Sequence, residues 1–236
     1  MPSRRGSASA DSLERLAAEV HSCRRCPRLV EWREAAAADP PRRFAGERYW
    51  ARPVSGFGDP RAAIVLIGLA PAANGANRTG RMFTGDRSGQ WLYAALHRAG
   101  LANQSSSVGR ADGLRLRGAY VTAVNRCPPP RNRPTPTERD TCLPYLAREL
   151  TLLDGARVLL ALGSFAWDGA LRALRDLGHE VPRPKPRFGH GAEAQIGSYA
   201  LLGCFHPSQQ NTFTGKLTEA MLDEIFARAR RLAGAG

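Results

Sequence analysis

The chain has 236 residues and a formal net charge of +13, and this length is sufficient for one α/β domain with a proper hydrophobic core. No stretch reaches the roughly 20 apolar residues of a membrane span, and the N-terminal segment lacks the apolar core of a secretory signal, so we expect a cytoplasmic protein. The basic charge favours a polyanionic partner, most often nucleic acid, although codon usage in a GC-rich genome would also enrich arginine.

Residues 1–10 are small, polar and basic, and we predict that they are disordered. Residues 11–236 are predicted to form one domain. A helix is expected to begin at Asp11, because Asp11 and Glu14 have the spacing of a capping box. The helix runs into Cys23-Arg24-Arg25-Cys26, where two cysteines separated by two residues can chelate one metal centre. Residues 33–60 show little periodicity, and no element is predicted there.

The apolar run over residues 62–69 predicts a buried parallel strand. Residues 68–89 follow it and form what we call the signature loop, which leads into a helix predicted over residues 90–99. The loop combines several glycines with Phe83, Asp86 and three arginines. Ligands bind at the carboxyl ends of strands in open α/β sheets, so this composition indicates a binding loop. Its glycine spacing resembles a P-loop, but Arg81-Met82 stands where Lys-Ser/Thr is required, which excludes that interpretation.

Three further strands are predicted over residues 119–125, 157–162 and 199–205, with helices between and after them. One helix opens with a capping box at Thr135 and is expected to break or kink at Pro144; another begins at residues 163–164, and the last covers residues 214–232. Asn125 and His206 end two of the strands. The alternation predicts a mainly parallel sheet covered by helices.

Four of the cysteines form a candidate metal site. Cys23 and Cys26 make one pair, while Cys127 and Cys142 lie far downstream with 14 residues between them. Four thiolates can hold Zn²⁺ or a [4Fe–4S] cluster, and the open second pair leans modestly toward iron–sulfur. Unligated thiols are the remaining alternative. Cys204 lies within a predicted strand and is assigned to the core.

Four stretches together resemble the uracil-DNA glycosylases, and they occur in the expected order: Gly68-Leu69-Ala70-Pro71, Asn77-Arg78-Thr79-Gly80-Arg81-Met82-Phe83-Thr84-Gly85-Asp86, Cys127-Pro128-Pro129 and Cys204-Phe205-His206-Pro207-Ser208. The resemblance is closest to the iron–sulfur family 5 type, often called UDGb, and extends from Cys23 to the last helix. It implies a single three-layer α/β domain with a central, mainly parallel four-stranded sheet flanked by helices.

The resemblance also implies an activity and a cofactor. A monomeric, nucleoid-associated DNA repair enzyme would flip uracil out of double-stranded DNA and hydrolyse its N-glycosidic bond, leaving an abasic site. Hypoxanthine and other deaminated or damaged bases would be further substrates. The implied cofactor is a [4Fe–4S] cluster on Cys23, Cys26, Cys127 and Cys142.

The resemblance, combined with residue chemistry, suggests roles around the base. Phe83 would stack on the flipped base, and Asn125 would read the pyrimidine edge, because an amide both donates and accepts. Backbone amides near Ala73 and Asn74 would contact the base as well. Family members commonly carry histidine where this chain has Asn74, so the role of that side chain stays open.

Two residues are the catalytic candidates, and five others would contact DNA. His206 would stabilise the anionic departing base, and Asp86 would orient water or stabilise the cationic sugar. The alternative for Asp86 is simple capping of the following helix. Contacts to the DNA backbone, or filling of the gap left by the base, are assigned to Arg78, Arg81, Gln209, Gln210 and Asn211.

Two other functions remain open at this point. A non-catalytic iron–sulfur or zinc protein would bind uracil-containing DNA without releasing the base. A nucleotide-binding α/β protein is disfavoured by the missing P-loop lysine.

Overall fold

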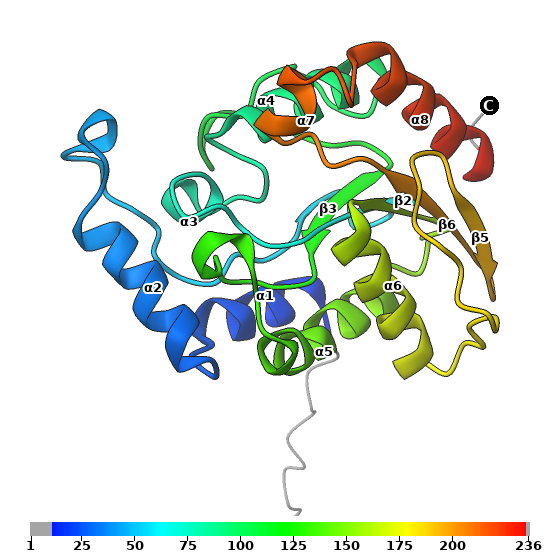
Figure 1. Cartoon of the computed structure of the whole chain (residues 1–236), viewed down its shortest axis with the longest axis horizontal. Coiled ribbons are helices and arrows are strands. Elements are labelled where there is room, and N and C mark those ends of the chain that lie inside the picture. The colour runs from blue at the N-terminus through cyan, green and yellow to red at the C-terminus, as the bar shows by residue number, and fades with distance from the viewer. Residues whose placement is uncertain (1–10, 235–236) are drawn as a thin grey trace, which may run out of the picture.

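The computed structural model describes residues 11–234, so the predicted disorder of residues 1–10 lies outside the described part of the chain. Six strands form one mixed sheet in the order β1-β3-β2-β4-β6-β5, flanked by helices on both faces (Figure 1). The strands are β1 (Phe57–Gly58), β2 (Ile64–Gly68), β3 (Ala119–Ala123), β4 (Val158–Leu162), β5 (Glu193–Ile196) and β6 (Tyr199–Cys204). The helices are α1 (Leu13–Ser22), α2 (Pro27–Ala38), α3 (Ala76–Thr79), α4 (Arg87–Arg98), α5 (Pro136–Leu152), α6 (Ser164–Asp176), α7 (Gln209–Phe213) and α8 (Glu219–Leu232).

The predicted four-stranded parallel core is confirmed. β3, β2, β4 and β6 pair in parallel, with Leu66 opposite both Val121 and Leu160. Every residue of β2, β3 and β4 is buried, because helices cover both faces of these strands. Two short antiparallel edge strands, β1 and β5, extend the sheet beyond the prediction.

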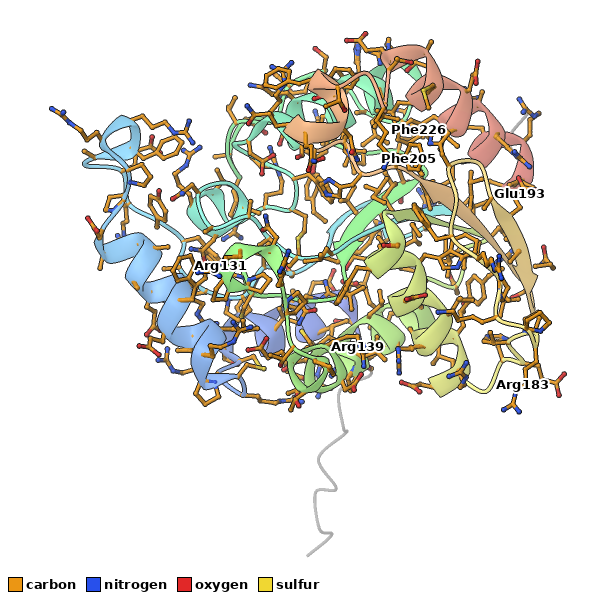
Figure 2. All side chains as sticks on the ribbon, in the orientation of Figure 1. Arg131, Arg139, Arg183, Glu193, Phe205 and Phe226 are labelled. Carbon is orange, nitrogen blue, oxygen red and sulfur yellow. The ribbon has the colours of Figure 1, made fainter. Side chains whose placement is uncertain are left out.

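Alternate side chains of each central strand enter two separate cores. Leu66 and Leu160 pack with α4 and α8 on one face, where Phe226 of α8 is fully buried. Val65 and Leu159 pack with α5 and α6 on the other face, around the buried Trp167. Figure 2 shows Phe226 between α8 and the sheet. The period of two along a strand thus separates the helices into two layers.

Several predicted helix boundaries were wrong. Ser12, and not Asp11, caps α1, because the Ser12 hydroxyl accepts the amide of Arg15. Helix α2 falls partly within the region without predicted structure. Of the break or kink expected at Pro144, the break does not occur, because α5 runs through this residue. Asp140, whose carbonyl the proline leaves without a helical partner, is exposed. The capping box at Thr135 is confirmed.

The C-terminal region is divided into two helices. The predicted helix over residues 214–232 begins only at Glu219. Residues 209–213, for which no element was predicted, form α7 with Ser208 as its N-cap. No helix in the described part of the chain is long and apolar enough to cross a membrane.

Candidate active site and cysteine centre

Two adjoining cavities open at the carboxyl ends of the parallel strands. The inner cavity, of about 480 Å³, is lined by Leu69, Ala70, Ala72, Phe83, Asp86, Ser88, Asn132, His206, Ser208, Gln209 and Gln210. The outer cavity, of about 530 Å³, is lined by Trp32, Arg43, Phe44, Ala72, Ala73, Asn74, Gly75, Gly85, Asp86, Arg87, Gln90, Pro129, Arg131, Asn132 and Gln209. Both cavities share four of these residues and are therefore contiguous. Phe83 and Asp86 of the signature loop meet His206, from the last of the four stretches, in the inner cavity.

Phe83 is held in a conformation that its own side chain disfavours. Its φ is +52°, in the left-handed region that glycine tolerates best. A Cβ on Gly68 would lie 2.8 Å from the Phe83 ring, and a Cβ on Gly89 would lie 1.7 Å from the Phe83 carbonyl oxygen. Both ends of the signature loop are therefore glycine because Phe83 occupies the space where a side chain would be.

His206 faces Phe83 across the inner cavity. Their ring centroids are 5.7 Å apart, with 31° between the ring planes. Burial lowers the pKa of His206 to about 4, so the imidazole is neutral at physiological pH and carries one N–H donor. Asn211 donates from Nδ2 to the His206 carbonyl at 2.8 Å. Asn211 thus fixes the backbone of His206 and does not line either cavity.

Asp86 caps a helix and also lines both cavities. Its Oδ1 accepts the Gly89 amide at 2.9 Å, which makes it the N-cap of α4. A Cβ at Gly75 would stand 2.4 Å from Oδ2, so only glycine leaves that oxygen room. Burial raises the pKa of Asp86 against the opposing hydrogen bonds from the amides of Gly89 and Ser88. The two interpretations of Asp86, cap and catalytic carboxylate, are therefore compatible.

Ala73 and Asn74 line the outer cavity, not the inner one. Tyr49 donates its hydroxyl to Asn74 Oδ1 at 2.9 Å, and the Asn74 carbonyl accepts Nε of Arg78 at 3.0 Å. The Asn74 side chain therefore ties the signature loop to the segment before β1.

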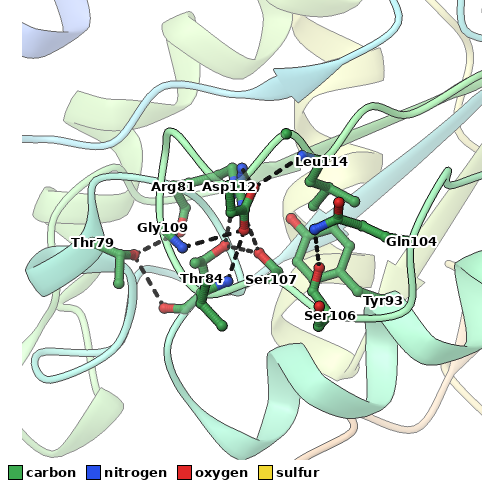
Figure 3. A network of polar contacts seen from close by, with 12 residues as sticks. Thr79, Arg81, Thr84, Tyr93, Gln104, Ser106, Ser107, Gly109, Asp112 and Leu114 are labelled. Atoms are coloured by element: carbon green, nitrogen blue, oxygen red, sulfur yellow. Dashed lines mark hydrogen bonds and ion pairs between the residues drawn. The ribbon is translucent and has the colours of Figure 1, made fainter.

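Arg78 and Arg81, predicted to contact DNA, are engaged inside the protein. Arg78 donates to the Gly85 carbonyl at 3.0 Å and pairs with Glu47 at 2.5 Å. Arg81 is only 3% exposed and forms a two-pronged ion pair with Asp112 (Figure 3). Burial alone would raise the pKa of Asp112, but hydrogen bonds from Arg81 and from backbone amides outweigh it and hold that pKa below its usual range. Arg81 is therefore a buried ion-pair partner of Asp112, and its guanidinium is not exposed at the surface as a DNA contact would require.

Gln209 and Gln210 are exposed at the start of α7 and line the inner cavity. Asn125 lies elsewhere. Its side chain is fully buried, Nδ2 donates to the Glu138 carbonyl at 3.1 Å, and Oδ1 has no partner among the described residues. Asn125 lines neither cavity, so the structure does not bring it together with Phe83.

Asn132 is the amide that the sequence interpretation missed. It lines both cavities and has a φ of +55°, as does its neighbour Arg131. Such conformations in consecutive non-glycine residues cost free energy and cluster at functional sites. The only available signal in the sequence was an asparagine within a basic, proline-rich segment, which also suits an ordinary turn.

The four candidate ligand cysteines line one small cavity beside the sheet. Cys23 ends α1 and Cys26 caps α2, while Cys127 follows β3 and Cys142 lies within α5. All four are free thiols. Arg25 and Arg126 also line the cavity, and no carboxylate does. Within residues 11–234, no three His, Cys, Asp or Glu side chains are placed to hold a single metal ion.

Two polar contacts reach the cysteine sulfurs. The Arg126 amide donates to Cys142 Sγ at 3.2 Å, and the buried Arg33 donates from Nη1 to Cys127 Sγ at 3.1 Å. The Arg33 carbonyl accepts Nδ2 of Asn77 at 3.2 Å, and the same Nδ2 donates to the Ala73 carbonyl at 3.3 Å. Arg33 and Asn77 thus connect the cysteine cavity to the signature loop.

Comparisons with known proteins agree with this arrangement. A family model described as the uracil DNA glycosylase superfamily matches residues 55–230, which include the signature loop, Cys127 and His206. The chain is 56% identical over 227 residues to the type-5 uracil-DNA glycosylase of Mycobacterium bovis, covering 95% of this chain and 83% of that relative. Identity to the protein of the same name from Mycobacterium leprae is 53%, with coverages of 97% and 99%. The chain is also 50% identical to the type-5 uracil-DNA glycosylase of Thermus thermophilus, covering 90% of this chain and 94% of that relative.

Proposed function

The chain belongs to the uracil-DNA glycosylase superfamily, and from that premise we infer that it excises uracil from DNA as a repair glycosylase. The observation that carries this inference is the meeting of Phe83, Asp86 and His206 in the inner cavity. The cavity is walled by an aromatic ring, a carboxylate and a neutral imidazole, which suits an extruded base. Because the substrate is DNA, we propose the nucleoid as the place where the protein acts, and we propose that it acts as a monomer on double-stranded DNA.

The reaction breaks the bond between C1′ of the sugar and N1 of uracil. Phe83 stacks on the extruded base, and the N–H of the neutral His206 donates a hydrogen bond to the base as negative charge develops on it. Removal of one such donor from an active site costs a factor of about 10² to 10³ in rate. A neutral imidazole suits this role because it donates without itself protonating the leaving group.

Asp86 acts on the sugar side of the same bond. Its Oδ1 is held by the Gly89 amide, so the carboxylate has a fixed position. Oδ2 then orients the attacking water, or stabilises the positive charge that develops on the sugar. The water oxygen forms the new bond to C1′ and its proton passes to the Asp86 carboxylate, while uracil departs as an anion with the electron pair of the broken bond.

We further propose that hypoxanthine is a second substrate. The inner cavity measures about 480 Å³, and its wall at Ala72 carries only a methyl group. A purine therefore meets no bulky side chain at that position. A duplex with deoxyinosine in place of deoxyuridine tests this directly.

The proposed cofactor is a [4Fe–4S] cluster on Cys23, Cys26, Cys127 and Cys142. Support comes from the donor set: four free thiols line one cavity with two arginines and no carboxylate, which suits an anionic cluster. When bound, the cluster would supply a cross-link between α1, α2, the end of β3 and α5.

One assay tests the activity. Purified protein is incubated with a labelled uracil-containing duplex, treated with alkali and analysed for strand scission, with a thymine-containing duplex as the control. Scission of the uracil strand alone is expected. Binding without scission, by protein with an intact cluster, would instead support the alternative of a non-catalytic DNA-binding protein.

A second assay tests the cofactor. We expect a visible iron–sulfur absorption band together with bound iron and sulfide, and we expect Cys127→Ala to lose them. Colourless protein carrying zinc would refute the cluster while leaving the glycosylase activity to the first assay.

A further inference from the structure

The outer cavity has a charge that suits an anionic ligand. Three arginines line it, Arg43, Arg87 and Arg131, against one carboxylate, that of Asp86. Within residues 11–234 none of these three guanidiniums forms an ion pair, in contrast to Arg78 and Arg81. Figure 2 shows Arg131 on the η2 turn (Pro130–Asn132), on the side of the molecule that faces α2. Uncompensated positive charge around a cavity attracts phosphate.

The cavity also offers an aromatic surface. Trp32 projects from α2, lines the cavity and is 39% exposed, one of only a few large apolar side chains in the described residues that are exposed. The other aromatic residue, Phe44, is covered by two guanidiniums, with Arg78 4.0 Å and Arg43 4.7 Å from its centroid. Trp32 is therefore the ring on which a base can stack.

Backbone strain concentrates where the two cavities meet. Among the described residues, four non-glycine residues have a positive φ, and three of them, Phe83, Arg131 and Asn132, line the cavities. Such conformations persist only where the surrounding structure enforces them. The strained η2 turn places Arg131 in the outer cavity and Asn132 at the junction of both.

We propose that the outer cavity binds the nucleotide next to the extruded one, with its base stacked on Trp32 and its phosphates near Arg43, Arg87 and Arg131. Contiguity supports this assignment, because Ala72, Asp86, Asn132 and Gln209 line both cavities. The proposal rests on the proposed function, since the extruded base must occupy the inner cavity. It makes an unstacked neighbouring base part of what the enzyme recognises.

The test combines a protein variant with a substrate change. Duplexes carry uracil and, on its 5′ or its 3′ side, a tetrahydrofuran spacer that lacks a base. With the unmodified duplex, we expect Trp32→Ala to lower kcat/KM by roughly tenfold and Trp32→Phe to lower it far less. At one of the two positions, the spacer should lower kcat/KM of the wild type by about the same factor as Trp32→Ala does. The same spacer should leave kcat/KM of Trp32→Ala unchanged.

Val108→Ala is the matched control, because Val108 is an exposed apolar residue, at 69%, that lines neither cavity. Thermal unfolding and circular dichroism establish that each variant is folded. The effect of the spacer on the wild type is measured independently of any variant. Loss of the spacer effect in Trp32→Ala supports the stacked neighbour. The proposal would be overturned if Trp32→Ala and the wild type had equal kcat/KM. It would also be overturned if the spacer, at each of the two positions, lowered kcat/KM of Trp32→Ala by the same factor as that of the wild type.

Salt dependence separates base stacking from phosphate binding. Arg131→Gln should reduce the slope of log affinity against log salt concentration by about 1, whereas Trp32→Ala should leave that slope unchanged. A reduced slope in Arg131→Gln together with an unaffected Trp32→Ala would mean that the cavity holds phosphate alone, and the stacking proposal would fail. Because uracil excision by the wild type is measured in each of these experiments, failure of the stacking proposal is distinguishable from failure of the glycosylase assignment.

Discussion

Gly68 and Phe83 are in such close contact that a methyl group on Gly68 would lie 2.8 Å from the Phe83 ring. Gly68 ends β2, and Phe83 comes 15 residues later in the same loop. The last residue of the strand thus sets the position of the ring that stacks on the base. The Phe83 ring can therefore keep its position in the binding site only if residue 68 has no side chain.

Gly68→Ala should displace Phe83 and weaken base stacking. We expect a fall in kcat/KM of about 5- to 150-fold, because base–aromatic stacking contributes about 1–3 kcal/mol. Some loss of stability, of the order of 1–3 kcal/mol, should accompany it through overpacking. Gly109→Ala is the control, since a Cβ there meets nothing within 4 Å. Wild-type kinetics in Gly68→Ala would show that the ring relaxes without functional cost.

Asp86→Asn separates the two roles of this carboxylate. Asparagine is as good an N-cap as aspartate, so α4 should keep its stability. The negative charge that acts on water or on the sugar is lost, and single-turnover excision should slow by about 10² or more. Asp86→Ala should show the same kinetic loss together with about 1 kcal/mol of destabilisation. A near-wild-type rate in Asp86→Asn, measured by single-turnover strand scission, would restrict Asp86 to capping.

The sequence predicted the parts of this site that depend on short-range patterns. The central strands are continuous apolar runs because helices cover both faces, and the capping box at Thr135 is a local signal. The adjacency of the strand ends then followed from parallel topology. The grouping of Phe83, Asp86 and His206 came from the resemblance to the uracil-DNA glycosylases, and all three line the inner cavity.

The remaining features depend on contacts distant in sequence. Arg81 was assigned to DNA contact, and its ion pair with Asp112 was not predicted because the two residues are 31 positions apart in the sequence. The edge strands β1 and β5 are too short for a periodic signal. Asn132 enters the cavities through two consecutive positive φ angles, which composition does not reveal.

The pH dependence of excision should follow Asp86, not an ordinary histidine. Burial lowers the pKa of His206 to about 4 and raises that of Asp86 above the usual range of an aspartate. Both groups have their working form at higher pH: neutral imidazole and ionised carboxylate. As pH falls, the rate is lost as Asp86 is protonated at its raised pKa and as His206 is protonated near about 4. No inflection is expected near about 6.5, the unperturbed histidine value.

Single-turnover rates across the acid range check this prediction. Asp86→Asn should remove the inflection that Asp86 causes, at a lower overall rate. An inflection near about 6.5 that disappears in His206→Gln would mean that the imidazole titrates normally. Folding is followed in parallel by circular dichroism, so that acid unfolding is not mistaken for titration of the site.

Arg33 should influence the proposed cluster through charge. Its guanidinium is buried and donates to Cys127 Sγ at 3.1 Å, and its ion-pair partner among residues 11–234 is Glu34, at 3.9 Å. A positive group beside a thiolate stabilises the more negative, reduced state of an iron–sulfur cluster. Arg33→Met keeps much of the packing volume but removes the charge and the hydrogen bond. We therefore expect a lower reduction potential and faster loss of iron to a chelator.

Arg98→Met is the control for a change of net charge, because Arg98 lies on α4, away from the cysteines, and pairs with Asp223 at the surface. Iron content, release of iron to a chelator and the midpoint potential are measured on both variants and on the wild type. Equal values in Arg33→Met and the wild type would show that the guanidinium does not act on the cluster. A shift of the same size in both variants would trace the effect to net charge, because of these two arginines only Arg33 donates to a ligand sulfur.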